Sequence, residues 1–253
     1  MQRQCLRVTL SSSSWWQQQQ QRTAAAAAAV VVNNCRRRFL SHQTNHFVKI
    51  VEVGPRDGLQ NEPTLISVED KVDLITRLAN AGCHVIEAGS FVSPTWVPQM
   101  ADSQHVMKAL HDWRSQQQQQ QRNTKTSLFS CLVPNRQGLE QAMACQALDE
   151  VAIFASASPA FSQRNLNCTI EDSMERFALV AQECKNHQIP LRGYVSCVVA
   201  CPYSGPVAPA AVAHVVEQLL QLGCHEISLG DTIGVGTPGT TRAMLDAVKV
   251  RRL

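Results

Sequence analysis

An arginine and a carboxylate are adjacent at Arg56 and Asp57, directly after the apolar run Val48–Val53 and the turn residues Gly54-Pro55. A carboxylate is a ligand that hard divalent cations prefer, and a guanidinium stabilises negative charge that develops on a carbonyl oxygen during a reaction. The pair therefore suits metal-assisted chemistry on a carbonyl compound. Such a pair after a strand is also typical of a capped turn or a surface ion pair, so it does not decide the function alone.

Glu87 is a second unusual carboxylate, because it lies inside the apolar segment His84–Ala88. A carboxylate is seldom buried without a hydrogen-bonding or charged partner, so a partner for Glu87 is expected. Further polar residues follow other apolar runs, each at the point where the run ends. They are Gln60, Ser90, Ser156, Ser158, Ser196, Cys197, Asp231 and Thr232.

Six strand-like runs alternate with helical stretches and could place these side chains at one edge of a sheet. The runs are Val48–Val53, His84–Ala88, Ser127–Val133, Val151–Ala155, Leu191–Val199 and His225–Leu229. This alternation predicts an α/β fold with a parallel sheet. No G-x-G-x-x-G segment follows the first run, which favours a TIM (β/α)8 barrel with about six of its eight units over a doubly wound open sheet. In such a barrel the active site lies at the carboxyl ends of the strands.

Charge is divided unevenly along the chain. Residues 1–48 hold six arginines and no acidic residue, which leaves 17 basic and 20 acidic side chains in the remainder. The folded part therefore lacks the excess of positive charge that a nucleic-acid-binding protein needs. An Arg-, Ser-, Gln- and Ala-rich leader without acidic residues is typical of mitochondrial transit peptides, so residues 1–45 predict a matrix protein. A secretory signal and plain low-complexity sequence are the alternatives.

Cysteines and glutamines bear on the domain boundaries. The chain has ten cysteines, scattered mainly through apolar segments, which is typical of core thiols in a reducing compartment and not of a disulfide framework. The glutamine-rich segment 115–123 predicts a disordered surface-loop insertion. No apolar run is long enough to span a membrane. The barrel domain is expected to cover residues 46–248, followed by a divergent tail at 249–253.

Five longer segments resemble the hydroxymethylglutaryl-CoA lyase family, and they occur in that family's order. They are Val51–Glu62, Ser90–Ser103, Arg164–Ser173, Arg192–Tyr203 and Glu226–Gly239. The resemblance implies a retro-Claisen cleavage of 3-hydroxy-3-methylglutaryl-CoA to acetyl-CoA and acetoacetate, a step of leucine breakdown and ketone-body formation. A homocitrate- or isopropylmalate-synthase-like activity on a CoA ester, within the same barrel superfamily, is the enzymatic alternative.

The resemblance also implies roles for single residues. Asp57 would bind Mg²⁺ or Mn²⁺, and Arg56 would stabilise the enolate of the departing acetyl-CoA. The other residues would complete the polar pocket: Glu87 and Asp231 as catalytic residues, and Gln60, Ser90 and Thr232 as substrate-binding residues. Arg164 and Asn165 would lie near the CoA portion. This sequence departs from the family pattern at Thr95, where a lysine or arginine is expected, and at Pro63.

The resemblance ends near Ala247-Val248. The family's next segments, a His-x-His-Asp motif whose histidines bind the metal and a Gly-Gly-Cys-Pro-Tyr loop with a catalytic cysteine, have no counterpart here. We therefore expect a truncated product with little activity by itself. The alternative from another class is a non-catalytic variant that forms a homodimer or pairs with full-length subunits through its open sheet edges.

Overall fold

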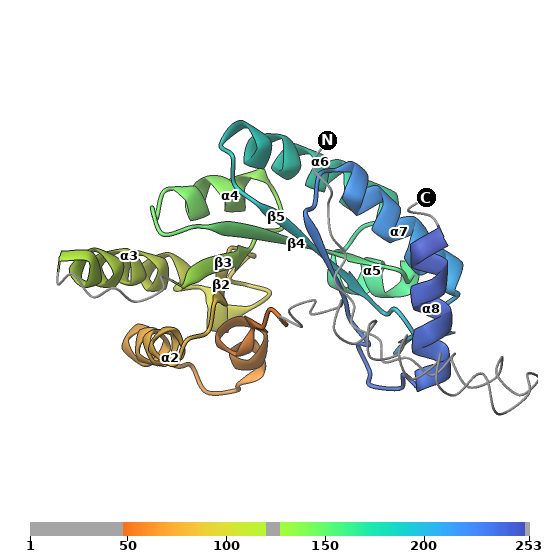
Figure 1. Ribbon diagram of the computed structural model, residues 1–253, viewed down its shortest axis with the longest axis horizontal. Helices are drawn as coiled ribbons and strands as arrows, with labels where there is room; N and C mark the ends of the chain where they lie inside the picture. Colours follow the sequence, from red (N-terminus) through yellow and green to blue (C-terminus); the bar gives the residue numbers. More distant parts are fainter. Residues whose placement is uncertain (1–47, 120–126, 251–253) are drawn as a thin grey trace, which may run out of the picture. The chain divides into compact units, whose positions relative to one another are not determined.

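The computed structural model describes residues 48–119 and 127–250 (Figure 1). The predicted leader, residues 1–45, lies outside these ranges. The unit that begins at Ile50 holds every helix and strand of the described part. None of these helices is long and apolar enough to cross a membrane.

A six-stranded, fully parallel sheet organises this unit. Its order is β1-β2-β3-β4-β5-β8, so neighbouring strands follow one another along the chain. The strands are β1 (Val51–Glu52), β2 (Val85–Ser90), β3 (Leu128–Leu132), β4 (Glu150–Ser156), β5 (Leu191–Ser196) and β8 (Glu226–Leu229). Sequential order with right-handed crossovers places the connecting helices on one face, as in a barrel, whereas a doubly wound sheet reverses its order at a switch point. The sequence prediction of a partial barrel is therefore confirmed.

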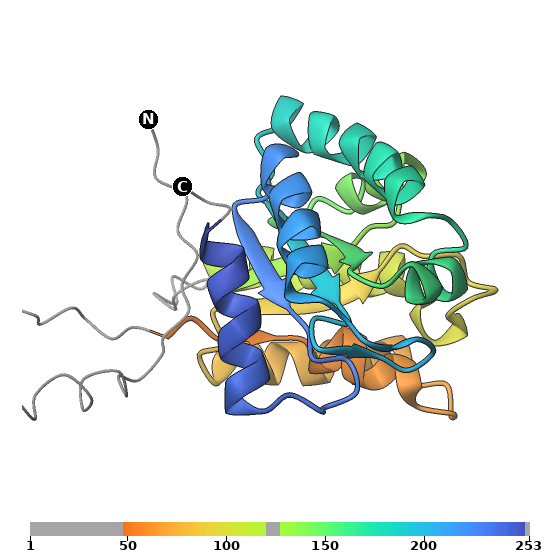
Figure 2. The same cartoon turned by 90° about the vertical axis from the view of Figure 1, so that its right-hand side faces the viewer.

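Helices connect successive strands. The α-helices are α2 (Val68–Asn80), α3 (Ser103–Gln119), α4 (Arg136–Met143), α5 (Pro159–Asn165), α6 (Ile170–Asn186), α7 (Pro209–Gln221) and α8 (Pro238–Val250). Shorter elements are the helical turns η1 (Gly54–Gly58), η2 (Leu59–Asn61) and η3 (Pro98–Met100), and the antiparallel hairpin of β6 (Ala200–Cys201) and β7 (Gly205–Pro206). α7 and α8 lie side by side (Figures 1 and 2).

Several of these boundaries follow from local chemistry. The Ser67 hydroxyl accepts the backbone N–H of Asp70 at the start of α2, and Thr169 and Asp172 form a complete capping box at the start of α6. Both caps satisfy N–H groups that have no partner within the helix.

The two faces of the sheet differ in polarity. Alternate residues of β4, such as Val151 and Ile153, are fully buried, whereas Phe154 of the opposite face lines a pocket. The opposite, inner face also carries Glu87, Glu150 and Arg192, all almost inaccessible to solvent. The inner face is therefore a polar layer, and the apolar core includes the side chains on the outer face.

Arg192 is the centre of an ion network at the amino ends of three strands. Its guanidinium donates to both oxygens of Glu150 on β4, at 2.9 and 3.2 Å, and lies 2.8 Å from Glu226 on β8. Burial lowers the pKa of Arg192, but Glu150 and then Glu226 outweigh burial and raise it overall. The network joins β4, β5 and the edge strand β8.

Some sequence predictions need correction. α3 continues through Gln119, so the loop predicted for 115–123 is wrong for residues 115–119. The physical reason is that glutamine is a good helix former. Residues 120–126 lie outside the described residues. β1 has only two residues, since the turn η1 starts at Gly54. β5 ends at Ser196 because Cys197 adopts a left-handed φ of 61°. α8 includes Lys249 and Val250, and the divergent tail predicted for 249–253 stays a prediction.

The eight cysteines of the described part are all free thiols, and seven of them are buried. This agrees with the prediction of small core residues. It also leaves the fold to be held by packing, hydrogen bonds and ion pairs in the ranges that the structure covers.

Candidate active site

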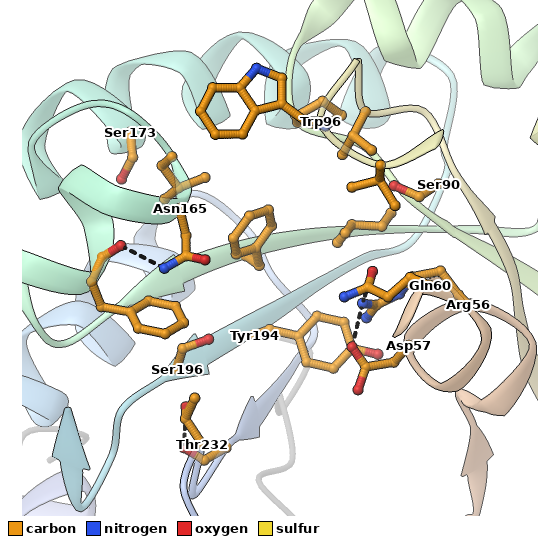
Figure 3. A pocket seen from close by; sticks show the side chains of 18 of the residues that line it. Arg56, Asp57, Gln60, Ser90, Trp96, Asn165, Ser173, Tyr194, Ser196 and Thr232 are labelled. Carbon is orange, nitrogen blue, oxygen red and sulfur yellow. Dashed lines mark hydrogen bonds and ion pairs between the residues drawn. The ribbon is translucent and has the colours of Figure 1, made fainter. Parts of the chain in front are cut away.

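A pocket of about 1040 Å³ opens at the carboxyl ends of the strands (Figure 3). One wall carries Arg56, Asp57 and Gln60 with Tyr194 beside them, and the opposite wall carries Asn165 and Ser173. Ser90, Trp96, Arg164, Arg176, Ser196, Asp231 and Thr232 also line it. The structure therefore gathers most of the predicted polar residues around one cavity, at the edge where a barrel binds its ligands.

The turn η1 presents Arg56 and Asp57 to this pocket. Pro55 occupies one of its first two positions, and the Val53 carbonyl accepts the backbone N–H groups of Arg56 at 3.1 Å and of Asp57 at 2.7 Å. Arg56 is 8% exposed, and its Nη1 atom lies 2.7 Å from the Asp57 carboxylate and 3.5 Å from Gln60 Oε1. The turn thus places a fixed cation beside a carboxylate that is 57% exposed and faces solvent.

Arg56 is the partner that was expected for the buried carboxylate of Glu87. The Glu87 carboxylate is fully buried, one oxygen accepts a short bond from Arg56 Nε, and the other accepts the Tyr194 hydroxyl at 2.5 Å. Glu87 does not line the pocket, so it lies behind Arg56 and not in contact with a ligand. Its predicted catalytic role accordingly becomes a hypothesis of positioning, in which Glu87 fixes Arg56.

Tyr194 was not predicted from the sequence, although a signal exists. Alternate residues of β5 point to one face, and Arg192, Tyr194 and Ser196 share a face with the barrel interior. The Tyr194 ring also lies under Arg56, with 5.9 Å from the guanidinium carbon to the ring centre. Applying strand alternation from Ser196 would have identified this residue.

Burial and charge act against each other at this cluster. Burial lowers the pKa of Arg56, but the carboxylates of Glu87 and Asp57 outweigh it and raise the pKa overall, so the guanidinium stays charged. Burial, followed by the Glu87 charge, raises the pKa of the Tyr194 phenol. Tyr194 therefore remains a neutral hydrogen-bond donor to Glu87 at physiological pH.

Asp57 is the predicted metal ligand, and its surroundings bear on that prediction. Within the described residues no three His, Cys, Asp or Glu side chains cluster as metal ligands. Asp57 and the amide oxygen of Gln60 are nevertheless hard oxygen donors on one pocket wall. Mg²⁺ typically binds one or two carboxylates and completes its coordination with water and substrate, so these donors fit such an ion in kind.

Ser90 differs from the other hydroxyls of the site. Its side-chain oxygen is buried and has no hydrogen-bond partner among the described residues, while its backbone N–H donates to Ser103 Oγ at 3.0 Å. An unsatisfied buried hydroxyl costs about 1–3 kcal/mol. Because Ser90 borders the pocket, this cost is consistent with its predicted role in binding a polar substrate group.

Asp231 and Thr232 line the pocket without contacting the Arg56 cluster. The Asp231 carboxylate accepts the backbone N–H groups of Val235 at 3.2 Å and Gly236 at 2.6 Å, so it shapes the loop before α8. The Thr232 hydroxyl accepts the N–H of Cys197 at 2.7 Å and links the ends of β5 and β8. The catalytic role of Asp231 and the binding role of Thr232 stay predictions.

Cationic side chains border the far wall. Arg164, in the last turn of α5, lies 4.7 Å above the ring of Tyr203, and Asn165 donates to the Phe161 carbonyl at 3.1 Å. Arg176 of α6 also lines the pocket and was not predicted. Arg176 follows Asp172 of the capping box by four residues, which is about one helical turn, and it reaches the Leu166 carbonyl at the end of α5. This spacing could have indicated Arg176 as a pocket residue. Two arginines thus lie opposite the Arg56 wall.

An incomplete parallel barrel with a polar site at its strand ends defines an α/β-barrel protein with an enzyme-like pocket. The chain belongs to the HMGL-like family, whose model matches residues 47–252. It is 54% identical over 202 residues to the mitochondrial hydroxymethylglutaryl-CoA lyase of Arabidopsis thaliana, an alignment covering 80% of this chain and 41% of that protein. It is 52% identical to the 3-hydroxy-3-isohexenylglutaryl-CoA/hydroxymethylglutaryl-CoA lyase of Pseudomonas aeruginosa, covering 79% and 63%.

Solved structures agree with these relatives. The HMG-CoA lyase of Brucella melitensis superimposes with a TM-score of 0.72 at 53% identity, covering 80% of this chain and 68% of that one. Relatives named mitochondrial and relatives named cytoplasmic both occur. The chain spans about half the length of the curated relatives it matches.

Proposed function

We propose that this chain carries the binding and carbonyl-activating part of a hydroxymethylglutaryl-CoA lyase site. The observation that supports this most directly is the buried Arg56, held by Glu87 and facing a pocket beside Asp57. The names of the relatives favour a lyase over the synthases of the same superfamily.

The reaction breaks the bond between carbons 2 and 3 of the acyl chain while the 3-hydroxyl loses its proton. The electron pair of that bond passes to the thioester, where it forms the enolate of acetyl-CoA, and protonation of carbon 2 completes the product. Arg56 would meet the negative charge on the thioester oxygen, a charge that develops only during the reaction. A guanidinium already fixed in place needs little reorganisation as that charge forms.

Asp57 would hold the divalent cation, Mg²⁺ or Mn²⁺, with Gln60 on the same wall. When bound, the cation supplies Lewis-acid polarisation of the substrate oxygens. The Ser90 hydroxyl is free to donate to a carboxylate or hydroxyl of the substrate. Asp231 and Thr232 would complete the polar wall near the end of β8.

The CoA portion would extend toward the opposite wall. Arg164 and Arg176 border the pocket there, and guanidinium groups pair well with phosphate oxygens. Asn165 lies on the wall opposite Arg56, where it could bond the pantetheine amides (Figure 3). This arrangement orients the acyl end of the substrate toward Arg56 and Asp57.

The test is acetoacetate release from hydroxymethylglutaryl-CoA by the purified chain, with and without Mg²⁺ or Mn²⁺. Arg56→Gln should lower turnover by at least 100-fold, because it removes a charge-stabilising group. Arg77→Gln is the matched control, since Arg77 is an exposed arginine on α2 that pairs with Asp73. Equal turnover in both variants would contradict the proposal.

Metal binding has a test of its own. Mn²⁺ binding, followed by electron paramagnetic resonance of free Mn²⁺, should weaken at least tenfold in Asp57→Asn, because the ion loses its one carboxylate on this wall. Asp73→Asn, a carboxylate exposed on α2, should leave binding unchanged. Unchanged binding in Asp57→Asn would place the metal elsewhere.

The open sheet edges support a second candidate. In the part of the chain that the structure describes, β1 and β8 each pair on one side only, and an unpaired strand edge can pair with another chain. A homodimer, or a non-catalytic subunit paired with a full-length lyase, would use these edges. Light scattering of the chain alone and mixed with a full-length relative distinguishes a monomer from both complexes.

The matrix location is supported by the acid-free, arginine-containing leader and by relatives that are named mitochondrial. Fusion of residues 1–48 to a fluorescent protein should direct it into mitochondria. A cytosolic signal from this fusion would contradict the proposed location.

A further inference from the structure

We propose that Tyr194 is a positioning residue that keeps Arg56 available to the ligand by occupying one oxygen of Glu87. This inference rests on the proposed function, since it assigns a role within the same site. It follows from how the two oxygens of Glu87 are shared.

Glu87 binds Arg56 at one point only. Its Oε1 atom accepts from Arg56 Nε, and its Oε2 atom accepts the Tyr194 hydroxyl at 2.5 Å. Arg56 Nη1 is therefore directed to Asp57 at 2.7 Å and to Gln60 at 3.5 Å. Arg56 Nη2 donates no hydrogen bond within the described residues.

Another buried pair in the same chain shows the alternative. Glu150 accepts from both Nε and Nη2 of Arg192, at 2.9 and 3.2 Å, which is the two-point pairing that arginine and carboxylate commonly adopt. The two pairs share the donor and acceptor types and deep burial. They differ at the second oxygen of the carboxylate: in Glu87 it accepts the Tyr194 hydroxyl, whereas in Glu150 it accepts Arg192 Nη2 and lies 3.4 Å from His225 Nε2.

Removing the phenol should therefore convert the one-point pair of Arg56 and Glu87 into a two-point pair like that of Arg192 and Glu150. In Tyr194→Phe the freed oxygen of Glu87 would attract Arg56 Nη2, because a buried carboxylate oxygen without a partner is costly. The guanidinium would then rotate toward Glu87 and away from the pocket. The ring under Arg56 remains in the phenylalanine variant, so the effect isolates the hydroxyl.

Steady-state kinetics with hydroxymethylglutaryl-CoA test the consequence for the reaction. Tyr194→Phe should lower kcat about tenfold and change KM by less than about twofold, because Arg56 acts on charge that develops in the transition state. In the Glu87→Gln background the same change should cost less than about twofold, since the carboxylate through which Tyr194 acts is gone. Unchanged kcat in Tyr194→Phe, or equal losses in both backgrounds, would overturn the inference.

A second measurement does not depend on turnover. The chain has two tyrosines, Tyr194 and Tyr203, so Tyr203→Phe leaves Tyr194 as the sole phenol. Its ultraviolet absorbance should show no phenolate before the protein unfolds in alkali, and adding Glu87→Gln should bring ionisation into the folded range, because a negative neighbour is removed. Identical titrations with and without Glu87→Gln would refute the contact. Absence of wild-type turnover with the expected titration would instead reject the proposed function and leave the contact standing.

Discussion

Replacing Arg192 by methionine should destabilise the chain severely, because it leaves two carboxylates without their shared cation. Arg192 is 1% exposed, and Glu150 is 3% exposed. Removing one partner of a buried ion pair typically costs about 3–5 kcal/mol, most of it from the charge left behind. Domains of ordinary stability have only about 5–15 kcal/mol in total, so the variant should be marginal.

The assay is urea unfolding followed by circular dichroism at pH 8 and pH 5.5. A buried carboxylate without a cation has a raised pKa in the folded state, so stability is present when it is protonated and is lost as pH rises through that pKa. The difference from wild type should therefore shrink by about 1 kcal/mol or more at pH 5.5, since one pKa unit corresponds to about 1.4 kcal/mol.

The double variant Arg192→Met with Glu150→Gln provides the control. It removes the more buried of the two carboxylates together with the arginine and should recover part of the lost stability at pH 8. It also keeps the experiment informative if the single variant does not fold. A loss below about 1 kcal/mol in the single variant, with no dependence on pH, would refute the electrostatic account of this network.

Two further predictions concern local structure. Asn135→Ala should lower stability by about 1 kcal/mol in the same assay, because the Asn135 side chain accepts the N–H of Gly138 at the start of α4, and Asn135→Ser should restore most of it. Gly138→Ala should cost about 1–3 kcal/mol, because its Cβ would lie 2.8 Å from the Phe91 carbonyl oxygen, whereas Gly58→Ala meets no atom within 4 Å and should be near neutral. Equal effects of the two glycine substitutions would contradict the packing argument.

The sequence was sufficient to predict the parallel sheet because strand-like and helical segments alternate clearly from Val51 onward. Strand order followed from the same alternation, since parallel neighbours need a crossover of helical length. Boundaries were less predictable where two tendencies compete. The glutamines after Ser115 are compatible with both a low-complexity loop and a helix, and they continue α3 because glutamine is a good helix former.

The candidate site was predictable only as a set of residue types. Arg56 and Asp57 are adjacent in sequence, so their pairing needed no knowledge of the fold. The contact between Glu87 and Tyr194 joins residues 107 positions apart and depends on the register through which β2, β3, β4 and β5 pair. A change of register by one residue would turn Tyr194 to the other face of the sheet.

The inner face of the sheet explains why the site residues break the usual strand pattern. Glu87 and Arg192 occupy buried strand positions where apolar residues would be more stable in isolation, and each is matched by a partner from a different part of the chain. Such departures from local rules concentrate where function requires them. At Arg192 both oxygens of the partner carboxylate are used, and the result is structural. At Arg56 a tyrosine takes one of them, and the guanidinium keeps donors that a ligand can use.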